Sequence, residues 1–452
     1  MNPTQPQAGP AGTGHEPRQK ALIEWVLSPI AEVHRDEVGR ALLMTLLMFM
    51  VLGAYYELKT AREAFLLSQD GAEVKSYSSA GQALLLLFLV PAYGAFASRV
   101  DRGNLIRWVT LFFVANIALF VLAVEAGLQI GVVYFLWVGI FNVMVIAQFW
   151  AFANDIFTPE QGKRIFPLIG VGSSLGAWIG SVRAGWIMQT GSATELLVRG
   201  GLLLCVCVVI AHVLNRMATR APVIGQPAAV ADKLGKEGGF ELIRKDRYLM
   251  LIAALTVLLN VVNTSGEYLF GRYVVEQANA LHADAATRER FIGETYSQLF
   301  SAVNLIGFLL QMFVVSRVFR YLGVGKALFI HPVVALTGYL LMLRAPSLEA
   351  MRVLKVADNS IDYSLGSTTK QALWLPTSRE AKYKAKQAVD SFFVRAGDVI
   401  QAGVVFVGER LAFAVPAFAA VNVLLAGAWL AVAGLLQVAL RRKAEETRTA
   451  EL

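Results

Sequence analysis

Charged residues are scarce in this sequence, and cysteine is almost absent. Only 16% of the 452 residues are charged, whereas 56% are hydrophobic and the mean hydropathy is +0.54. The only cysteines, Cys205 and Cys207, point in different directions on a helix, so no disulfide or metal site is expected from them. The five histidines lack metal-ligand spacing, which disfavours a metal-dependent enzyme and predicts no cofactor. The composition predicts a polytopic membrane protein.

Hydrophobic runs long enough to cross the ~30 Å apolar layer of a bilayer recur along the whole chain. Lys and Arg in the short connections fall on one side, so the positive-inside rule predicts that both termini are cytoplasmic. The formal charge of +8 follows from this topology, and it does not indicate nucleic-acid binding. The twelve predicted helical spans are residues 39–58, 77–98, 104–124, 128–154, 165–189, 195–216, 247–271, 291–316, 323–343, 348–374, 386–410 and 414–440.

Two short motifs recur at nearly the same offset, which indicates an internal duplication. Residues 98–102 after the second span resemble residues 316–320 after the eighth, and residues 158–163 after the fourth span resemble residues 377–382 after the tenth. The sequence therefore predicts an all-α protein of two six-helix bundles. This architecture is typical of the major facilitator superfamily, in which two halves rock around a central site. The predicted segments are an N-terminal tail (1–38), two bundles (39–216 and 247–440), a cytoplasmic linker (217–246) and a C-terminal tail (441–452).

The N-terminal tail contains no apolar core near its start, so it is not expected to be a cleavable signal peptide. Residues 1–20 are rich in Pro, Gly and Gln and are expected to be disordered. Residues 21–33 are compatible either with an amphipathic helix on the membrane surface or with a plain extension of the first span.

The tenth predicted span carries ionisable residues along one face of a helix. Lys355, Asp358, Asp362 and Lys370 follow the 3.6-residue period. Because ionisable groups are costly in hydrocarbon, this stripe predicts a watery path for a substrate or ion. The alternative is internal ion pairing that only holds helices together.

Two other spans carry polar groups at helical spacing. In the seventh, Asn263 and Glu267 share one face, and in the eleventh Arg395 and Asp398 do the same, so both faces are expected to look into a cavity.

The first span ends in a charged segment, residues 57–63. This segment either continues the helix into an outer vestibule or forms a periplasmic loop, and the sequence leaves both open. In the fifth span, three glycines spaced four residues apart, Gly172, Gly176 and Gly180, predict close helix packing.

The connections after the fourth and tenth spans are basic and lie on the cytoplasmic side. We expect them to form matched intracellular gate elements that meet when the inside is closed, with at least one pair of opposite charge between the halves. The predicted gate residues are Asp155, Lys163, Arg164, Lys384, Lys386 and Asp390.

Several segments resemble the ATP/ADP translocase family, the nucleotide transporters of plastids and intracellular bacteria. FWAFAND (149–155) and GKRIFPLIG (162–170) resemble that family's "FWGFAN…AKRFYPLFG" motif. DYSLGSTTKQALWLP (362–376) and KAKQAVD (384–390) are similar to its "YSLFDPTKEMAYIPL…KGKAAVD" block, and LKTARE (58–63) lies where the family has an "LRSTKD"-like segment. The resemblance implies exchange of ATP for ADP or import of nucleotides.

This sequence departs from the family pattern in ways that bear on the substrate. Arg62-Glu63 replaces Lys-Asp, and Thr369-Lys370-Gln371 replaces Thr-Lys-Glu. A nucleoside triphosphate carries about four negative charges and would favour a cavity with excess Lys and Arg. The candidate cavity charges do not show such an excess: they comprise the basic residues Lys59, Arg62, Lys355, Lys370 and Arg395 and the acids Glu57, Glu63, Glu267, Asp358, Asp362 and Asp398. Pairs that open on binding, a less charged substrate, or proton coupling through an acid such as Asp362 or Glu267 would each explain this balance.

We therefore predict a secondary transporter of a bacterial inner membrane, not an enzyme, that acts as a monomer in the lipid bilayer by alternating access. A nucleotide or related phosphorylated metabolite is the first-choice substrate. The alternatives are a proton-coupled transporter of an unrelated small molecule and a membrane scaffold or sensor that transports nothing. Lys370 is expected to bind phosphate oxygens, and the helical rise of roughly 12 Å from Asp362 would let the two interact only through water or a bent helix. The predicted substrate-binding residues are Lys59, Arg62, Asn263, Glu267, Lys355, Asp358, Asp362, Lys370, Arg395 and Asp398.

Overall fold

A computed structural model describes residues 31, 33–34, 37–97, 102–220, 238–344 and 347–450, which are helical with short connections. The first half of the chain contains α2 (Val38–Gln69), α3 (Ala72–Ala97), α4 (Arg102–Glu125), α5 (Gly131–Ile156), α6 (Pro159–Thr190) and α7 (Ala193–Arg220). The second half contains α8 (Gly239–Lys245), α9 (Arg247–Leu281), α10 (Ala285–Phe313), α11 (Val315–Ala327), α12 (Ile330–Arg344), α13 (Leu348–Ile361), η1 (Asp362–Gly366), α14 (Ser367–Ala372), η2 (Ala381–Ala385), α15 (Lys386–Ala388), η3 (Val389–Phe393), α16 (Val394–Arg410) and α17 (Val415–Ala450), where η denotes a π-helical segment.

The prediction of an all-helical membrane protein is confirmed, but the number of twelve spans is not. Within the described ranges, nine helices are long and apolar enough to cross a membrane, or ten if α11 and α12, which meet at 74°, form one bent span. The two predicted spans outside this set are α3, which begins with a polar stretch, and the α13–η1–α14 run, which carries the charged stripe. The ninth predicted span, 323–343, is also misplaced, because α12 begins only at Ile330.

Local sequence determines where the long helices begin. Thr158 accepts a hydrogen bond from the Gln161 amide at 3.2 Å, and the Gln161 side chain accepts one from the Thr158 amide at 3.0 Å. This capping box, with Pro159 as the first helical residue, starts α6 at once after α5. Asp246 and Asp284 are simple N-caps of α9 and α10: their side chains accept hydrogen bonds from the amides of Tyr248 and Thr287. The predicted gate residues Lys163 and Arg164 consequently lie in the first turns of a helix, although the sequence analysis placed them in a loop.

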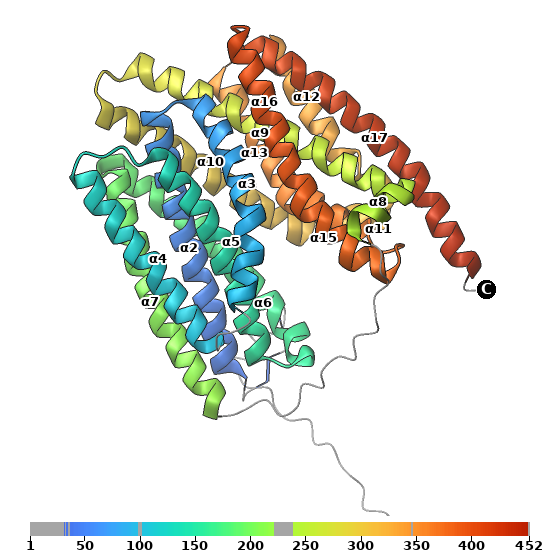
Figure 1. Cartoon of the computed structure of the whole chain (residues 1–452), viewed down its shortest axis with the longest axis horizontal. Helices are drawn as coiled ribbons and strands as arrows, with labels where there is room; N and C mark the ends of the chain where they lie inside the picture. The colour runs from blue at the N-terminus through green and yellow to red at the C-terminus, as the bar shows by residue number, and fades with distance from the viewer. Residues whose placement is uncertain are drawn as a thin grey trace, which may run out of the picture.

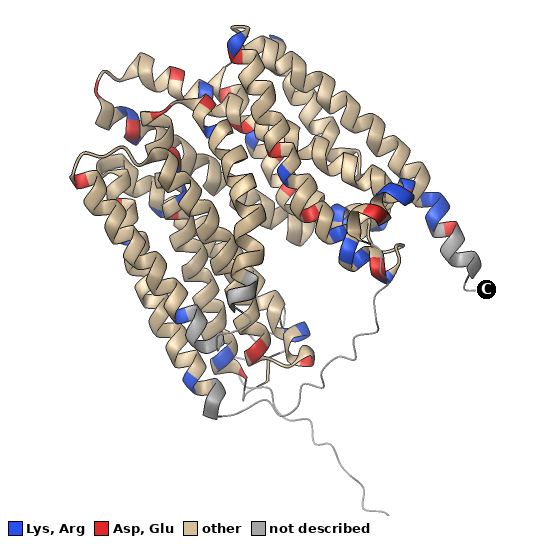
Figure 2. Ribbon diagram, in the orientation of Figure 1, with Lys and Arg blue, Asp and Glu red and all other residues tan. Residues whose placement is uncertain are grey.

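The helices form two bundles that lie side by side and meet along two seams (Figure 1). In one bundle α2 packs against α5, α6 and α7, and in the other α9 packs against α13, α16 and α17. Across the seams, α10 packs against α6 and α2, and α3 packs against α16 and α9. Most of the length of α4, α7 and α17 carries no charged residue, whereas charged residues gather between the bundles and at the helix ends (Figure 2).

Parts of the predicted tails and linker are helical. The last helix α17 continues to Ala450, so most of the predicted tail 441–452 extends this helix, and α8 lies within the predicted linker just before α9. Lys443 of α17 pairs with Asp246 at 2.6 Å, which ties the tail to the start of α9. The predicted surface helix 21–33 lies almost entirely outside the described residues, as does most of the repeat motif at 98–102.

The glycine stripe of α6 packs directly against the backbone of α2. A Cβ atom added at Gly176 would lie 2.1 Å from the Phe49 carbonyl oxygen, and one added at Gly180 would lie 2.5 Å from the Gly53 carbonyl oxygen. No side chain larger than hydrogen fits at either position without moving a backbone. The close helix packing predicted from the glycine spacing is therefore confirmed.

Replacing Gly176 with alanine is expected to destabilise the protein by about 1–3 kcal/mol, because the new methyl group overpacks the contact between the two helices. The apparent melting temperature of the purified protein in detergent measures this loss. Gly170→Ala is the matched control in the same helix, since a Cβ there has no neighbour within 4 Å. Equal melting temperatures for the two variants would contradict this account of the packing.

Candidate functional site

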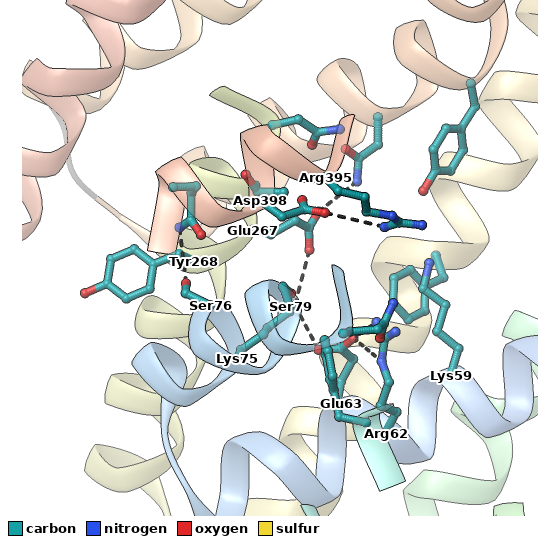
Figure 3. Close-up of a pocket in the computed structure, with 18 residues that line it drawn as sticks. Lys59, Arg62, Glu63, Lys75, Ser76, Ser79, Glu267, Tyr268, Arg395 and Asp398 are labelled. Carbon is teal, nitrogen blue, oxygen red and sulfur yellow. Dashed lines mark hydrogen bonds and ion pairs between the residues drawn. The ribbon is translucent and has the colours of Figure 1, made fainter. Parts of the chain in front are cut away.

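A polar cavity of ≈ 220 Å³ lies between the two bundles, with walls from both halves of the chain (Figure 3). It is lined by α2, α3 and α5 on one side and by α9, α10, α13 and α16 on the other, with Tyr363 of η1. Six of the ten predicted substrate-binding residues line it: Lys59, Arg62, Asn263, Glu267, Arg395 and Asp398.

The charged end of the first span lies in this cavity. Helix α2 continues without a break to Gln69, so the alternative of a periplasmic loop is wrong. The ammonium of Lys59 lies 4.2 Å from the centre of the Phe300 ring, and the Arg62 guanidinium lies 4.5 Å from that of Phe135. Arg62 also pairs with Glu63, the next residue. Within the described ranges, Lys59 makes no ion pair.

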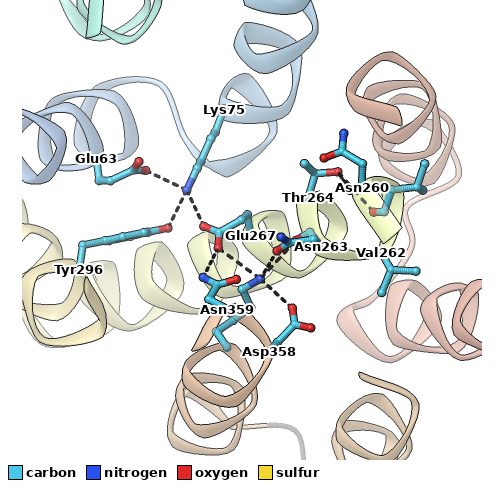
Figure 4. A network of polar contacts seen from close by, with 12 residues as sticks. Glu63, Lys75, Asn260, Val262, Asn263, Thr264, Glu267, Tyr296, Asp358 and Asn359 are labelled. Atoms are coloured by element: carbon cyan, nitrogen blue, oxygen red, sulfur yellow. Dashed lines mark hydrogen bonds and ion pairs between the residues drawn. The ribbon is translucent and has the colours of Figure 1, made fainter. Parts of the chain in front are cut away.

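Lys75 of α3 bridges the two halves and was missed by the sequence analysis (Figure 4). Its ammonium lies 2.8 Å from the Glu63 carboxylate of α2 and 3.3 Å from the Glu267 carboxylate of α9. It also donates a hydrogen bond to the Tyr296 hydroxyl of α10 at 3.2 Å. A lysine at the polar start of an otherwise apolar span could have marked Lys75 as a candidate. The sequence alone does not reveal its two carboxylate partners.

Lys355, the buried lysine of the tenth span, lies behind the cavity wall and contacts the cavity residue Glu267. Lys355 has no solvent exposure, and its ammonium lies 3.2 Å from both Glu267 and Asp358. It also donates to the Asn263 side-chain oxygen at 2.8 Å, and Asn359 donates to Glu267 at 3.1 Å. The prediction that Lys355 and Asp358 contact substrate is therefore corrected: neither lines the cavity, because this face of α13 packs against α9.

The eleventh span places a second charged pair in the cavity wall. Arg395 lies 3.4 Å from Asp398, and Asn260 of α9 donates to the same carboxylate at 2.8 Å. One turn further along α16, Gln401 donates to the Ser76 hydroxyl of α3 at 3.1 Å. The predicted cavity face of α16 is thus correct, and it also contributes to the seam between the halves.

The prediction for Lys370 and Asp362 needs correction. Their side chains form a direct ion pair at 3.3 Å, and neither lines the cavity between the bundles. The π-helical segment η1 lies between α13 and α14 and widens the helix by an extra residue per turn. This local change in helical period brings together two side chains that a regular α-helix would hold apart.

The predicted gate residues lie at the end of the bundles that carries the starts of α2 and α9, here called the inner end. Arg164 pairs with Glu37 of its own half at 2.9 Å, and Lys384 pairs with Glu380 at 2.8 Å. Burial alone would raise the pKa of Glu37, but its hydrogen bonds with Arg164, the His34 amide and Gln161 hold it below the ordinary value. The remaining predicted gate residues, Asp155, Lys163, Lys386 and Asp390, are exposed or half-buried.

The start of α6 and the α15 segment lie apart in Figure 1. A charge pair between the halves at the inner end therefore remains a prediction for a state that is closed there.

The opposite end, which carries the α2–α3 turn and the start of α10, is here called the outer end. There Arg290 of α10 donates to the Gly191 carbonyl at 2.9 Å, and Glu289 accepts from the Ala193 amide at 3.0 Å. Together with the Lys75 bridge, these contacts join the two halves at the outer end. In the described part of the chain, no cluster of three or more His, Cys, Asp or Glu side chains could hold a metal ion.

Comparison with known proteins relates the chain to transporters. The family profile of the TLC ATP/ADP transporter matches residues 131–439. ADP,ATP carrier protein 1 of Chlamydia muridarum is 24% identical over 64% of this chain, and ADP,ATP carrier protein 5 of Rickettsia felis is 20% identical over 81%. The matches span 61% and 86% of those proteins respectively, so the chain covers less than two thirds of the first.

Solved structures with this fold include two further transporters. The nucleoside transporter NupG superposes with a TM-score of 0.63 at 12% identity, covering 89% of this chain and 98% of NupG. A bacterial homologue of the iron transporter ferroportin, solved in an inward-facing state, gives a TM-score of 0.62 at 14% identity, with the same coverage. At these identities the likeness concerns the fold, which is that of the major facilitator transporters.

Proposed function

Because the chain belongs to the TLC ATP/ADP transporter family, we propose that it is a secondary transporter that moves a nucleotide across a membrane by alternating access. The relatives that match it are ADP,ATP carriers, which makes an adenine nucleotide the first substrate to test. The cavity between the bundles is the site at which the substrate would bind.

The observation that carries this proposal is Lys59, a cation in the cavity wall that makes no ion pair with any described residue. Of the described residues that line the cavity, four are basic and three are acidic, so basic groups exceed acids by one. Arg62, Lys75 and Arg395 each pair with a carboxylate, whereas Lys59 pairs with no carboxylate of the described residues and lies over the rings of Tyr56 and Phe300. A lysine without a carboxylate partner is available to a phosphate group, for which it is a compact and mobile positive charge.

The other walls suit the rest of a nucleotide. Phe135 and Phe300 present aromatic faces on which a base could stack, and Asn263, Thr264 and Gln401 offer hydrogen-bonding groups for a base or ribose. Binding of phosphate would also compete with Glu63 for Arg62 and with Asp398 for Arg395. These pairs would then open as the substrate binds, as the balanced charges in the sequence suggested.

We also propose that the chain works as a monomer in a bacterial inner membrane with both termini in the cytoplasm. A single chain encloses the whole cavity, which supports the monomer. Basic residues gather near the ends of α8, α15 and α17 at the inner end (Figure 2), which supports a cytoplasmic location for that end.

Thermal stabilisation of the purified protein tests the substrate class. A ligand that binds only the folded protein stabilises it by about 2.7 kcal/mol at one hundred times its dissociation constant. We expect ATP or ADP to raise the melting temperature, and sugar phosphates and amino acids to have little effect. The nucleotide proposal fails if millimolar nucleotide produces no shift while another of these compounds does, and a transporter of an unrelated molecule then becomes the better hypothesis.

Replacing Lys59 with alanine is expected to weaken nucleotide binding by about tenfold or more, since a hydrogen bond to a charged group contributes about 1.5–3 kcal/mol. The dissociation constant of ATP, from titration of the thermal shift, measures the loss. Lys245→Ala, which removes an exposed lysine paired with Glu241 on α8, is the matched control and should leave binding unchanged. Equal dissociation constants of ATP for the Lys59→Ala and Lys245→Ala proteins would show that Lys59 does not bind the nucleotide.

A further inference from the structure

Behind the cavity, α12 carries a buried histidine that the proposed nucleotide site does not use. His331 is 5% exposed, and its Nε2 atom lies 2.8 Å from the Asp358 carboxylate. The other ring nitrogen, Nδ1, is buried and has no hydrogen-bond partner among the residues that the structure describes. Histidine is the side chain whose charge changes most readily near neutral pH, and an ionisable residue within a membrane protein is by default a functional candidate.

The unpartnered nitrogen faces the side of the tenth helix that carries Asp362. A Cβ atom added at Gly366 would lie 3.2 Å from His331 Nδ1 and 3.3 Å from Asp362 Oδ1, so these two atoms flank the glycine. A cavity of ≈ 20 Å³, large enough for one water molecule, lies beside Gly366; His331, Thr369 and Lys370 form its polar lining, six apolar side chains complete the wall, and Asp362 does not line it. Among the described residues, the buried Thr369 hydroxyl has no hydrogen-bond partner.

This side of the histidine connects to a group that solvent can reach. The Asp362 carboxylate pairs with Lys370, whose side chain is 33% exposed. Lys370 also lines the small cavity, so the Lys370–Asp362 pair lies between solvent and His331 Nδ1, where a single water molecule would complete a proton transfer. Glycine at position 366 leaves the space that this transfer needs.

The other side of the histidine connects to the cavity and to the Lys75 bridge at the outer end. Asp358 binds Lys355 at 3.2 Å, Lys355 binds Glu267 at 3.2 Å, and Glu267 binds Lys75 at 3.3 Å (Figure 4). The charged groups around the histidine are thus Asp358 and Lys355 of α13, Asp362 of η1 and Lys370 of α14. The remaining elements contribute neutral neighbours at this position: Leu255 and Leu259 of α9, Ala327 of α11, Leu328 just after it, and Trp429 of α17.

We propose that His331 and Asp358 form a proton-binding site that couples proton movement to transport of the substrate, an inference that rests on the proposed function. A proton passes from Asp362 through water to His331 Nδ1 and converts the neutral ring to imidazolium. The imidazolium then competes with Lys355 for the charge of Asp358. Lys355 consequently binds Glu267 more strongly, and Glu267 holds Lys75 less strongly, which loosens the outer end. Once the halves have rearranged, release of the same proton from Nδ1 to the opposite side of the membrane restores the neutral ring and the tighter bridge.

Proteoliposomes that contain purified protein and the trapped pH-sensitive dye pyranine provide the test. We expect ATP added outside to change the internal pH as it is transported, and His331→Gln to lower this proton flux by about tenfold or more, because glutamine binds no proton near neutral pH. Exchange of labelled ATP against trapped ATP, which needs no net proton movement, should persist in this variant. His282→Gln, at the end of α9 on the outer side, is the matched control and should keep both activities.

Three outcomes would overturn the proposal. The first is ATP exchange by the wild type without any proton signal, and the second is unchanged proton flux in His331→Gln. The third is the absence of nucleotide exchange in the wild type, which identifies the proposed function itself as the failure. If His331→Gln does not fold, Gly366→Ala replaces it, because the added methyl group fills the space between His331 and Asp362 and leaves the Asp358 contact in place. Proton flux at the wild-type level in Gly366→Ala would then reject the route.

Discussion

Replacing Lys355 with methionine is expected to lower the free energy of unfolding by about 3–5 kcal/mol and to stop transport, because it leaves buried carboxylates without their cation. Lys355 is fully buried and is bound by both Glu267 and Asp358. Methionine has nearly the same length, so the effect reports the lost charge and not a large cavity. The apparent melting temperature and the rate of nucleotide uptake into proteoliposomes measure the two losses.

The double variant Lys355→Met with Asp358→Asn provides the internal control for Lys355. Removing one of the two uncompensated charges should recover part of the lost stability, whereas transport should remain impaired. Lys245→Met, which removes a lysine with a 53% exposed side chain, should change neither quantity. If the Lys355→Met protein has the same apparent melting temperature as the wild type, the buried carboxylates do not need this lysine for stability.

Replacing Lys75 with methionine is expected to open the outer end, because Lys75 is the cation that Glu63 and Glu267 of opposite halves share. The two carboxylates then repel each other across the seam. A cysteine introduced at Ser297 reports the opening, since this side chain of α10 is buried against Gly185 of α6. Its labelling by a membrane-impermeant maleimide should accelerate by about tenfold, which corresponds to a shift of about 1.4 kcal/mol between the two states.

The labelling experiment needs a background in which Cys205 and Cys207 are replaced by serine, because Cys205 is exposed. The matched control is Lys245→Met, which removes an exposed pair with Glu241 on α8. It should leave the labelling rate unchanged, since such surface pairs contribute little. Labelling of the Lys75→Met protein at the rate of the control would mean that other contacts keep the outer end closed.

Helical periodicity predicted much of the cavity correctly. It placed Asn263 and Glu267 on one face of the seventh span and Arg395 and Asp398 on one face of the eleventh, and all four line the cavity. These residues lie on regular α-helices, where a spacing of three or four positions does imply a shared face. The same argument held for the close packing of α6 on α2, which depends only on the spacing of glycines.

Periodicity failed where the backbone departs from a regular α-helix or where the partner lies far away in sequence. The π-helical η1 brought Asp362 to Lys370, and a residue pattern alone does not predict an extra residue in a helical turn. Gly323, with a φ of 73°, interrupts α11 within the predicted ninth span. Lys75 was missed because Glu267, its partner across the seam, is 192 positions away.

The contact between α2 and α6 has a mechanical consequence. With carbonyl oxygens of one helix against glycines of the other, there are no flexible side chains between them to absorb a displacement. Helix α2 carries Lys59, which faces the cavity, and α6 carries Ser181, which accepts a hydrogen bond from Asn304 of α10 at 3.1 Å. Helices α2 and α6 are thus expected to move as one rigid unit. A displacement of the α2 backbone beside the cavity would therefore be passed to α6 and on to its seam with α10 of the other half.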